Sequence, residues 1–263
     1  MTATLLDDTD LARYERDGVI IPRHGLGDAR AAEMRAALDR WLAGYDGADA
    51  DFVPDILEQA PDWLRFATVS EIIEPVRQIL GDDVILWGSA LFCKSSEHGR
   101  ATPWHQDGRY WPIRPLATVT AWIAIDPVDT GNGCLRVIPG SHRPAELREH
   151  ARNDDAGYIL NQELAGEDWE ARSPMDIVLA PGQFSLHDVY LVHGACANTS
   201  GRRRAGLVFR YMPATAFYDR GLAREQGERL GIPGAASLVT RRLYQVSGID
   251  RSGRNDAVPV PAG

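Results

Sequence analysis

The hydrophobic pattern of the chain changes near residue 84. Before that point apolar residues recur at helical spacing, in segments bounded by capping residues and glycines. The spacing predicts three helices in this first part of the chain. They are capped by Thr9, Asp28 and Ser70 and end near Gly18, Gly44 and Gly81.

Short apolar segments follow from Val84, each bounded by glycine or proline. β-Branched and aromatic residues dominate them, which is typical of short strands joined by turns in a sandwich or barrel. A polar insertion, 144–173, separates two of these segments, and the part after Leu243 has the composition of irregular structure. The predicted strands are 84–94, 118–125, 133–141, 176–182, 184–193 and 206–213.

A single domain accommodates this order of elements. All-β folds of this length often form one domain, and the sequence shows no internal repeat or low-complexity tract. We therefore expect residues 1–83 to form a mainly helical flank, 84–213 the β core, and 214–263 a C-terminal cover of helix and loop.

Composition narrows the choice of partners. With a net charge of −9, the chain lacks the basic surface that nucleic acids and anionic membranes require. Its N-terminus does not read as a secretory signal, and no stretch reaches the roughly 20 apolar residues of a membrane helix. The cysteines show no CxxC spacing, which favours reduced thiols over a disulfide framework or a zinc knuckle. We expect a cytoplasmic protein that acts on a small molecule.

Three side chains form a candidate metal site. His105 and Asp107 lie two residues apart, so on an extended strand both point to the same face. His193, at the end of another predicted strand, supplies the third candidate ligand. Two neutral imidazoles and one carboxylate occupy one face of an octahedral Fe(II) ion and leave positions open for a bidentate 2-oxo acid and O₂. The same ligands also suit zinc, and an isolated HxD occurs by chance.

Arg204 is a candidate partner for such a 2-oxo acid. It follows His193 by 11 residues, across a turn that contains glycine. A 2-oxo diacid that chelates iron at one end needs a cation for its far carboxylate, and arginine offers a bidentate fork. The alternative interpretation is that Arg204 is a solvated member of the run 202–204.

The sequence resembles the phytanoyl-CoA dioxygenase family of Fe(II)- and 2-oxoglutarate-dependent oxygenases. The likeness begins at RDGVIIP (16–22) and reaches the last predicted strand, and it is most specific where HQD precedes P-x-R-P and A-W. The segments that carry it are LFCK (91–94), WHQDGRYWPIRP (104–115), TAWIAID (120–126), NGCLRVIPGSHR (132–143) and LVHGACANTSGRRR (191–204).

This resemblance implies a mainly β fold with flanking helices, a double-stranded β-helix of the cupin-like jelly-roll type. It implies that His105, Asp107 and His193 bind iron and that Arg204 binds the far carboxylate of 2-oxoglutarate.

Further residues match the family near the co-substrate. Trp122 matches a tryptophan beside 2-oxoglutarate, and Lys94 is another candidate for contact with it. The family's usual HGS after the last histidine is HGA here, so the hydroxyl that would stand at Ala195 is missing.

Four residues are candidates for substrate binding. Arg109 and Trp111 follow the HxD motif and should flank the mouth of the site. Arg210 lies amid apolar residues and needs either a substrate anion or a buried carboxylate as partner. His187 precedes His193 by six residues on one predicted strand, which places both on the same face.

The remaining histidines are assigned to other roles. His142 lies in a predicted turn, where a structural hydrogen bond accounts for it. His24, His98 and His150 are predicted to lie at the surface.

The resemblance implies oxidation of an unactivated C–H bond, with 2-oxoglutarate converted to succinate and CO₂. Hydroxylation of a small metabolite or natural-product intermediate is the expected reaction, and desaturation or ring closure at the same site is the alternative. Related halogenases replace the carboxylate ligand with a small residue, so Asp107 disfavours halogenation. A catalytically idle cupin-type binding protein has no need of Arg204, and a zinc hydrolase needs neither O₂ nor 2-oxoglutarate.

We also expect a mobile cover over the metal. The open end of a jelly roll must close before oxidation, and the polar segment 144–173 and the tail after Leu243 are long enough to close it. Arg251 and Arg254 in the tail could meet an anionic substrate. Solvated loops far from the site are the alternative.

Overall fold

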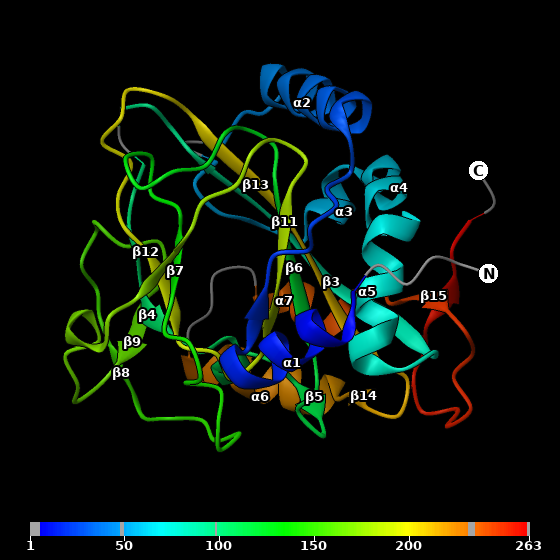
Figure 1. The fold of residues 1–263 in the computed structure, drawn as a ribbon. Helices are drawn as coiled ribbons and strands as arrows, with labels where there is room; N and C mark the ends of the chain where they lie inside the picture. The colour runs from blue at the N-terminus through cyan, green and yellow to red at the C-terminus, as the bar shows by residue number, and fades with distance from the viewer. Residues whose placement is uncertain (1–5, 48–49, 98, 231–234, 262–263) are drawn as a thin grey trace.

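A large and a small β-sheet, antiparallel except for the β15–β16 pair, two short ribbons and a layer of helices make up the computed structural model, which describes residues 6–47, 50–97, 99–230 and 235–261. Figure 1 shows α4 and α5 on one side of β3, β6 and β13, and β4, β7 and β12 on the other. The helices are α1 (Asp8–Asp17), α2 (Asp28–Ala43), α3 (Ile56–Gln59), α4 (Leu64–Ala67), α5 (Ser70–Leu80), α6 (Arg220–Leu230) and α7 (Ala235–Thr240). Short 3₁₀ turns are η1 (Pro61–Trp63), η2 (Asp107–Arg109) and η3 (Glu170–Arg172).

The strands form one large sheet, one small sheet and two ribbons. The large sheet runs β1 (Val19–Ile20), β11 (Phe184–Asp188), β6 (Val119–Ala124), β13 (Arg204–Pro213), β3 (Val84–Lys94), β15 (Tyr244–Ser247) and β16 (Val258–Pro259), and β2 (Val53–Pro54) also pairs with β3. The small sheet runs β10 (Met175–Ile177), β7 (Leu135–Val137), β12 (His193–Ala195) and β4 (Thr102–His105). The ribbons pair β5 (Ile113–Arg114) with β14 (Phe217–Tyr218) and β8 (His150–Arg152) with β9 (Gln162–Leu164).

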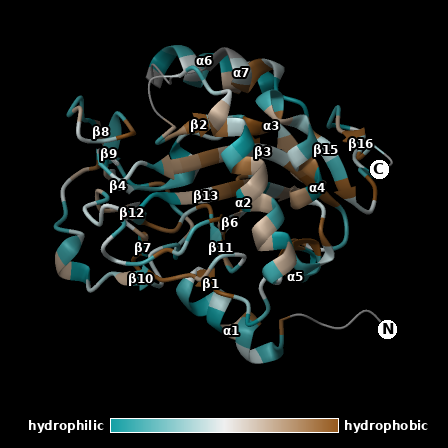
Figure 2. Cartoon of the chain, turned by 90° about the horizontal axis from the view of Figure 1, so that it is seen from above, coloured by the Kyte–Doolittle hydropathy of each residue, from teal (hydrophilic) through white to brown (hydrophobic). Residues whose placement is uncertain are grey.

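Strand β13 separates two interiors. Leu207 and Phe209 point to the main core, which also contains residues of α2 and α5. Val208 and Arg210 point the other way and line a cavity bordered by both sheets. This alternation follows from the two-residue period of a strand. In Figure 2, apolar stretches run along β3 and β13, because both faces of the central strands are covered. The predicted β-rich fold with flanking helices is confirmed.

The three predicted helices are present, but their first residues differ from the prediction. α1 is capped by Asp7, whose side chain accepts a hydrogen bond from the Asp10 backbone N–H at 2.9 Å, and Thr9 lies inside the helix. Asp28 and Ser70 are the first residues of α2 and α5, not their caps. All three helices end at the predicted glycines.

The single strand predicted over 184–193 is wrong. Asp188 accepts a hydrogen bond from the Tyr190 N–H through its side chain at 2.8 Å and from the Leu191 N–H through its carbonyl at 3.1 Å. This turn divides the segment into β11 of the large sheet and β12 of the small sheet. His187 and His193 therefore belong to different sheets, with ring centroids 5.0 Å apart. The other five predicted segments each overlap a strand.

The tail lies away from the polar insertion. β15 pairs with β3, and Arg251 forms an ion pair with Asp83 at 3.1 Å. In Figure 2 the labels β15 and β16 stand at the opposite end of the molecule from β8 and β9. None of the described residues after Leu243 lines the cavity, whereas Ser237, Leu238 and Arg241 before it do, and closure by the tail stays a prediction. The insertion contains the β8–β9 ribbon, and its residues 159–161 do line the cavity.

No helix among the described residues combines the length and apolar character that crossing a bilayer requires.

Phe209→Ala tests the main core. The Phe209 side chain is fully buried on the helix-facing side of β13. Removing it should lower the free energy of unfolding by about 3–5 kcal/mol, because a cavity remains where the ring packed. Urea denaturation measures this change, and Phe209→Leu should lose clearly less. A loss below about 1 kcal/mol for Phe209→Ala would show that the core collapses freely around this position.

Candidate metal centre

The pairing of β4 with β12 builds the metal centre. His105 is the last residue of β4 and His193 is the first of β12, and the register places the two residues directly opposite each other. Asp107 starts η2 just beyond β4. Potential ligand atoms of the three side chains lie within 4.8 Å of one another. All three residues are buried, at 4%, 7% and 5% exposure for His105, Asp107 and His193.

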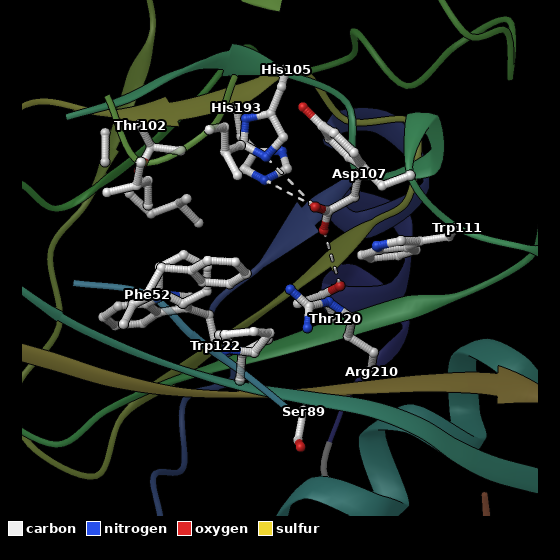
Figure 3. Close-up of a pocket in the computed structure, with 18 of the residues that line it drawn as sticks. Phe52, Ser89, Thr102, His105, Asp107, Trp111, Thr120, Trp122, His193 and Arg210 are labelled. Carbon is white, nitrogen blue, oxygen red and sulfur yellow. Dashed lines mark hydrogen bonds and ion pairs between the residues drawn. The ribbon is translucent and has the colours of Figure 1, made fainter. Parts of the chain in front are cut away.

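The expected extended geometry for the HxD motif is only half right. β4 ends at His105, and the chain then turns into η2 instead of continuing as a strand. Asp107 still reaches the two imidazoles: its Oδ1 lies 3.6 Å from His105 Nε2 and 3.9 Å from His193 Nε2. Figure 3 shows the three side chains converging on one point at the wall of the cavity.

Backbone carbonyls orient both imidazoles. His105 Nδ1 lies 2.9 Å from the Pro103 carbonyl oxygen, and His193 Nδ1 lies 2.9 Å from the Leu191 carbonyl oxygen. A carbonyl oxygen only accepts, so each Nδ1 carries the proton and donates it. Each Nε2 therefore presents its lone pair toward Asp107, as a metal-binding imidazole requires.

The protonation states suit a divalent cation. Burial by itself raises the pKa of Asp107, but the nearby His105, His187 and His193 side chains and the positive charge of Arg210 hold this pKa well below its usual range. Burial lowers the pKa of His193 well below its usual value. Thr120 Oγ1 lies 3.5 Å from Asp107 Oδ2 and can donate to it. An anionic carboxylate and neutral imidazoles on one side leave the other side open, which fits Fe(II).

Arg204 is buried in the same cavity and lies over Trp122. Its guanidinium carbon is 5.3 Å from the centroid of the Trp122 ring, and Nη2 donates to the Gly133 carbonyl at 2.8 Å. Its Nε has no hydrogen-bond partner among the described residues. Gly206 allows this arrangement, since a Cβ there would stand 2.1 Å from the Trp122 ring. The alternative of a solvated Arg204 is wrong, because the residue is 3% exposed.

Lys94 lies next to Arg204 but does not line the cavity. The two residues pair in register between β3 and β13, and Lys94 Nζ donates to the Cys196 carbonyl. Burial, together with the charge of Arg204, lowers the pKa of Lys94 to about 7. Its position thus favours support of the turn after β12 over contact with a bound co-substrate.

Three of the four candidate substrate residues line the cavity. Trp111, Arg210 and His187 do so, whereas Arg109 does not, although it directly follows the metal ligand loop. His187 reaches the cavity from β11, with its Nε2 3.8 Å from Asp107 Oδ2. Arg109 belongs to η2 and is not among the residues that line the cavity, so its position at the mouth stays a prediction.

Sequence reasoning missed the role of Gln106, between the two ligands of the HxD motif. Its side-chain amide donates to the carbonyls of Glu146 and Tyr190 and accepts from the Arg148 N–H. Its own backbone N–H donates to His150 Nε2 at 3.1 Å. These hydrogen bonds connect the start of the polar insertion to the segment 105–107, which carries two of the three candidate metal ligands.

His150 is a correction to the sequence analysis. It was predicted at the surface, but it is 8% exposed, and burial lowers its pKa to about 4. One of its polar partners, Arg148, lies two residues before it, but the other, Gln106, lies far away in the sequence. No local pattern could therefore reveal its burial. His98 lies outside the described residues, so its predicted exposure stays a prediction.

A family model for phytanoyl-CoA dioxygenase (PhyH) matches residues 14–206. The chain therefore belongs to the phytanoyl-CoA dioxygenase family of Fe(II)- and 2-oxoglutarate-dependent oxygenases. Iron and 2-oxoglutarate are thus its cofactor and co-substrate, and the HxD…H triad in the cavity matches this chemistry.

Individual relatives are similar at moderate identity. Peroxisomal phytanoyl-CoA dioxygenase of Mus musculus is 28% identical over 210 residues, which are 76% of this chain and 61% of that protein. The chain therefore spans less than two thirds of this relative's length. The apo structure of the non-haem monooxygenase ThoJ superposes with a TM-score of 0.71 at 21% identity, over 94% of this chain and 86% of that one. The epimerase SnoN, solved with Fe³⁺, α-ketoglutarate and nogalamycin RO, superposes with a TM-score of 0.65 at 26% identity, over 80% and 85% of the two chains.

Asp107→Ala tests the metal centre. Asp107 supplies the anionic ligand of the triad, so its loss should weaken the binding of Fe(II) or Co(II) by roughly 10–100-fold or more, as removal of supporting groups alone does. Anaerobic titration with Co(II), followed by its absorption spectrum, measures the affinity. Asp129→Ala, at an exposed surface ion pair, is the matched control. Unchanged Co(II) affinity in folded Asp107→Ala would remove this residue from the ligand set.

Proposed function

We propose that this chain hydroxylates an unactivated C–H bond of a small metabolite or natural-product intermediate. The observation that carries the proposal is a single cavity that holds both the histidine–carboxylate triad and Arg204 against Trp122. In each turnover a C–H bond becomes C–OH, and 2-oxoglutarate becomes succinate and CO₂. One oxygen atom of O₂ enters each of the two oxidised products.

The triad residues hold the iron in this proposal. His105, Asp107 and His193 bind it through Nε2, a carboxylate oxygen and Nε2, since these atoms converge at the cavity wall. The iron, when bound with 2-oxoglutarate and O₂, supplies the oxidising power for C–H cleavage. Thr120 keeps the second carboxylate oxygen of Asp107 in place.

Arg204 binds the far carboxylate of 2-oxoglutarate. Burial lowers its pKa to about 10, which still leaves the guanidinium charged at neutral pH. No carboxylate of the described residues forms an ion pair with it, so a ligand carboxylate is the missing partner. Trp122 fixes the plane of the guanidinium from one side, and a bidentate pair becomes possible on the other.

Three residues on the rest of the cavity wall are candidates for substrate binding. Trp111, His187 and Arg210 line the cavity and can contact a bound substrate. Arg109 keeps a role only if the loop that carries it moves, and Lys94 acts through the turn at Cys196.

Alternatives at the same site are desaturation and ring closure. Solved relatives include a carbocyclase and an epimerase of nogalamycin biosynthesis, each at 26% identity. An idle binding protein does not explain a buried Arg204 without an acidic partner, and a zinc hydrolase does not explain it either.

We also propose a cytoplasmic location, since Cys93 and Cys134 are buried free thiols.

Turnover of 2-oxoglutarate tests the proposed function. Purified protein with Fe(II), O₂ and 2-oxoglutarate should release succinate, and a panel of small metabolites should contain compounds that stimulate the release and gain one oxygen. Mass spectrometry of the products separates hydroxylation from desaturation. Substrate conversion that proceeds without O₂ and without 2-oxoglutarate would point to a hydrolase and overturn the proposal.

Arg204→Ala should raise the KM for 2-oxoglutarate by far more than changes at its neighbours. Loss of a desolvated, charge-assisted pair costs about 2–5 kcal/mol. Arg202→Ala is the matched control, because Arg202 pairs with Asp129 at the surface. Arg203→Ala should mainly lower stability, because Arg203 pairs with the buried carboxylate of Asp126. A normal KM in Arg204→Ala, with a raised KM in Arg202→Ala, would contradict the assignment.

Hydrogen exchange tests whether the insertion acts as a cover. Residues 159–161 line the cavity, whereas β15 pairs with β3 at a sheet position outside it. Anaerobic addition of Fe(II) and 2-oxoglutarate should slow amide exchange in 159–164 and leave 244–247 unchanged. No protection in the insertion would mean that 144–173 is not the cover, and protection of 244–247 would mean that the tail takes part in closing the site.

A further inference from the structure

The cavity extends beyond the metal triad to a second arginine. Arg210 lies six residues after Arg204 on β13, and the period of the strand places both on the cavity side. The Arg210 guanidinium lies 5.1 Å from the centroid of the Trp111 ring, as Arg204 lies over Trp122. In Figure 3 the Arg210 side chain points into the pocket beneath Asp107 and Thr120.

Arg210 lacks a partner for its charge. Its Nε is buried without a hydrogen-bond partner, and no carboxylate of the described residues forms an ion pair with it. Asp107 is close enough for its charge to act on Arg210, but in the proposed iron site this carboxylate binds the metal and is not a partner of Arg210. An unpaired cation in such surroundings is costly unless a ligand supplies the anion.

The neighbouring arginine is already neutralised. Arg241 forms an ion pair with Asp55 at 2.5 Å, and both residues are buried. Ser237 of α7 donates to the other oxygen of the same carboxylate. Arg241 lines the cavity together with Ser237, so this end of the cavity holds two arginines and one carboxylate. Its net charge is that of a single cation, contributed by Arg210.

Aromatic and aliphatic groups make up much of the remaining cavity wall, with Ser89 and Thr120 as polar exceptions. Trp111 and Leu238 lie at the Arg210 end, and Phe52 and Phe92, with ring centroids 4.9 Å apart, continue the apolar wall toward Trp122. A ligand here meets one positive charge within aromatic and aliphatic surroundings. This combination favours a carbon skeleton with one anionic group over a sugar or a polyol.

We propose that Arg210, with the Arg241–Asp55 pair behind it, binds the carboxylate of a small, largely apolar monocarboxylic acid that is the substrate. The proposal rests on the proposed function, and it adds the chemical class of the substrate. Arg204 and Arg210 lie against different tryptophans, so they serve two different carboxylates: that of 2-oxoglutarate and that of the substrate.

The charge balance selects a carboxylate over a phosphate. A phosphate monoester carries close to two negative charges at neutral pH, more than the single net cation at this end neutralises. The planar fork of arginine also matches the two oxygens of a carboxylate. A coenzyme A ester, with several phosphates, would have to leave them outside this cavity.

Anaerobic calorimetry on the protein loaded with Fe(II) and 2-oxoglutarate tests the proposal without turnover. The probes are butanoate, hexanoate and phenylacetate, each with its primary amide, and hexyl phosphate. The acids should bind roughly 10–100-fold more tightly than their amides, because the amide lacks the charge that Arg210 pairs with. Arg210→Gln should remove this preference, and Arg210→Lys should keep part of it. Arg202→Gln, at the surface, should leave the preference unchanged.

Several results would overturn the proposal. These are equal affinity for acids and amides, including no binding of either, an unchanged preference in Arg210→Gln, and tighter binding of hexyl phosphate than of hexanoate. Arg210 would be a counter-charge for Asp107 if Arg210→Gln lost Co(II) affinity and kept the preference for acids. Failure of the proposed function has a different signature, because the same preparation would then fail to bind 2-oxoglutarate or to release succinate when O₂ is admitted.

Discussion

The burial of charged groups between two apolar sheets is the constraint on which the rest of the structure depends. Asp107 and Arg204 are buried, Arg210 is half-buried, and all three face one cavity where water cannot solvate them fully. Each must then be balanced by a neighbour or a ligand. Asp107 lies beside the Nε2 atoms of two imidazoles, a ligand set that a bound cation completes, and the arginines lie on tryptophan rings without acidic partners. The site is therefore arranged for a cation and for anions that the protein itself does not supply.

Packing in the large sheet compensates for the free-energy cost of these charged groups. Strand β13 places Leu207 and Phe209 in the main core while Arg204 and Arg210 face the cavity. The helices α2 and α5 contribute to that core and cover the face opposite the site. Apolar burial on one face thus offsets the cost of charged groups on the other. Gly206 adds a local condition, because only a residue without Cβ lets Trp122 lie so close to the strand.

The small sheet and the polar insertion connect the metal to its surroundings. β12 pairs with both β4 and β7, so His193 is fixed by strands on each side. Gln106 then binds the backbone at Glu146 and Arg148, next to the metal ligand His105. A movement of the insertion consequently acts on the segment that carries two of the three proposed ligands. This connection is mechanical and does not depend on which substrate enters.

The sequence by itself determined the segments, the residue types of the site and the resemblance that led to the family. Apolar segments rich in β-branched and aromatic residues located β3 and β13, and His105, Asp107 and His193 stood out because their chemistry suits iron. Sequence reasoning missed the turn at Asp188, which accepts the Tyr190 N–H through its side chain, because apolar residues on both sides of it continue the strand pattern. Only the tertiary structure decided which charges face one cavity, why His150 is buried and where the tail lies. These properties depend on partners far apart in the sequence, and contacts between distant segments leave no periodic signal in the chain.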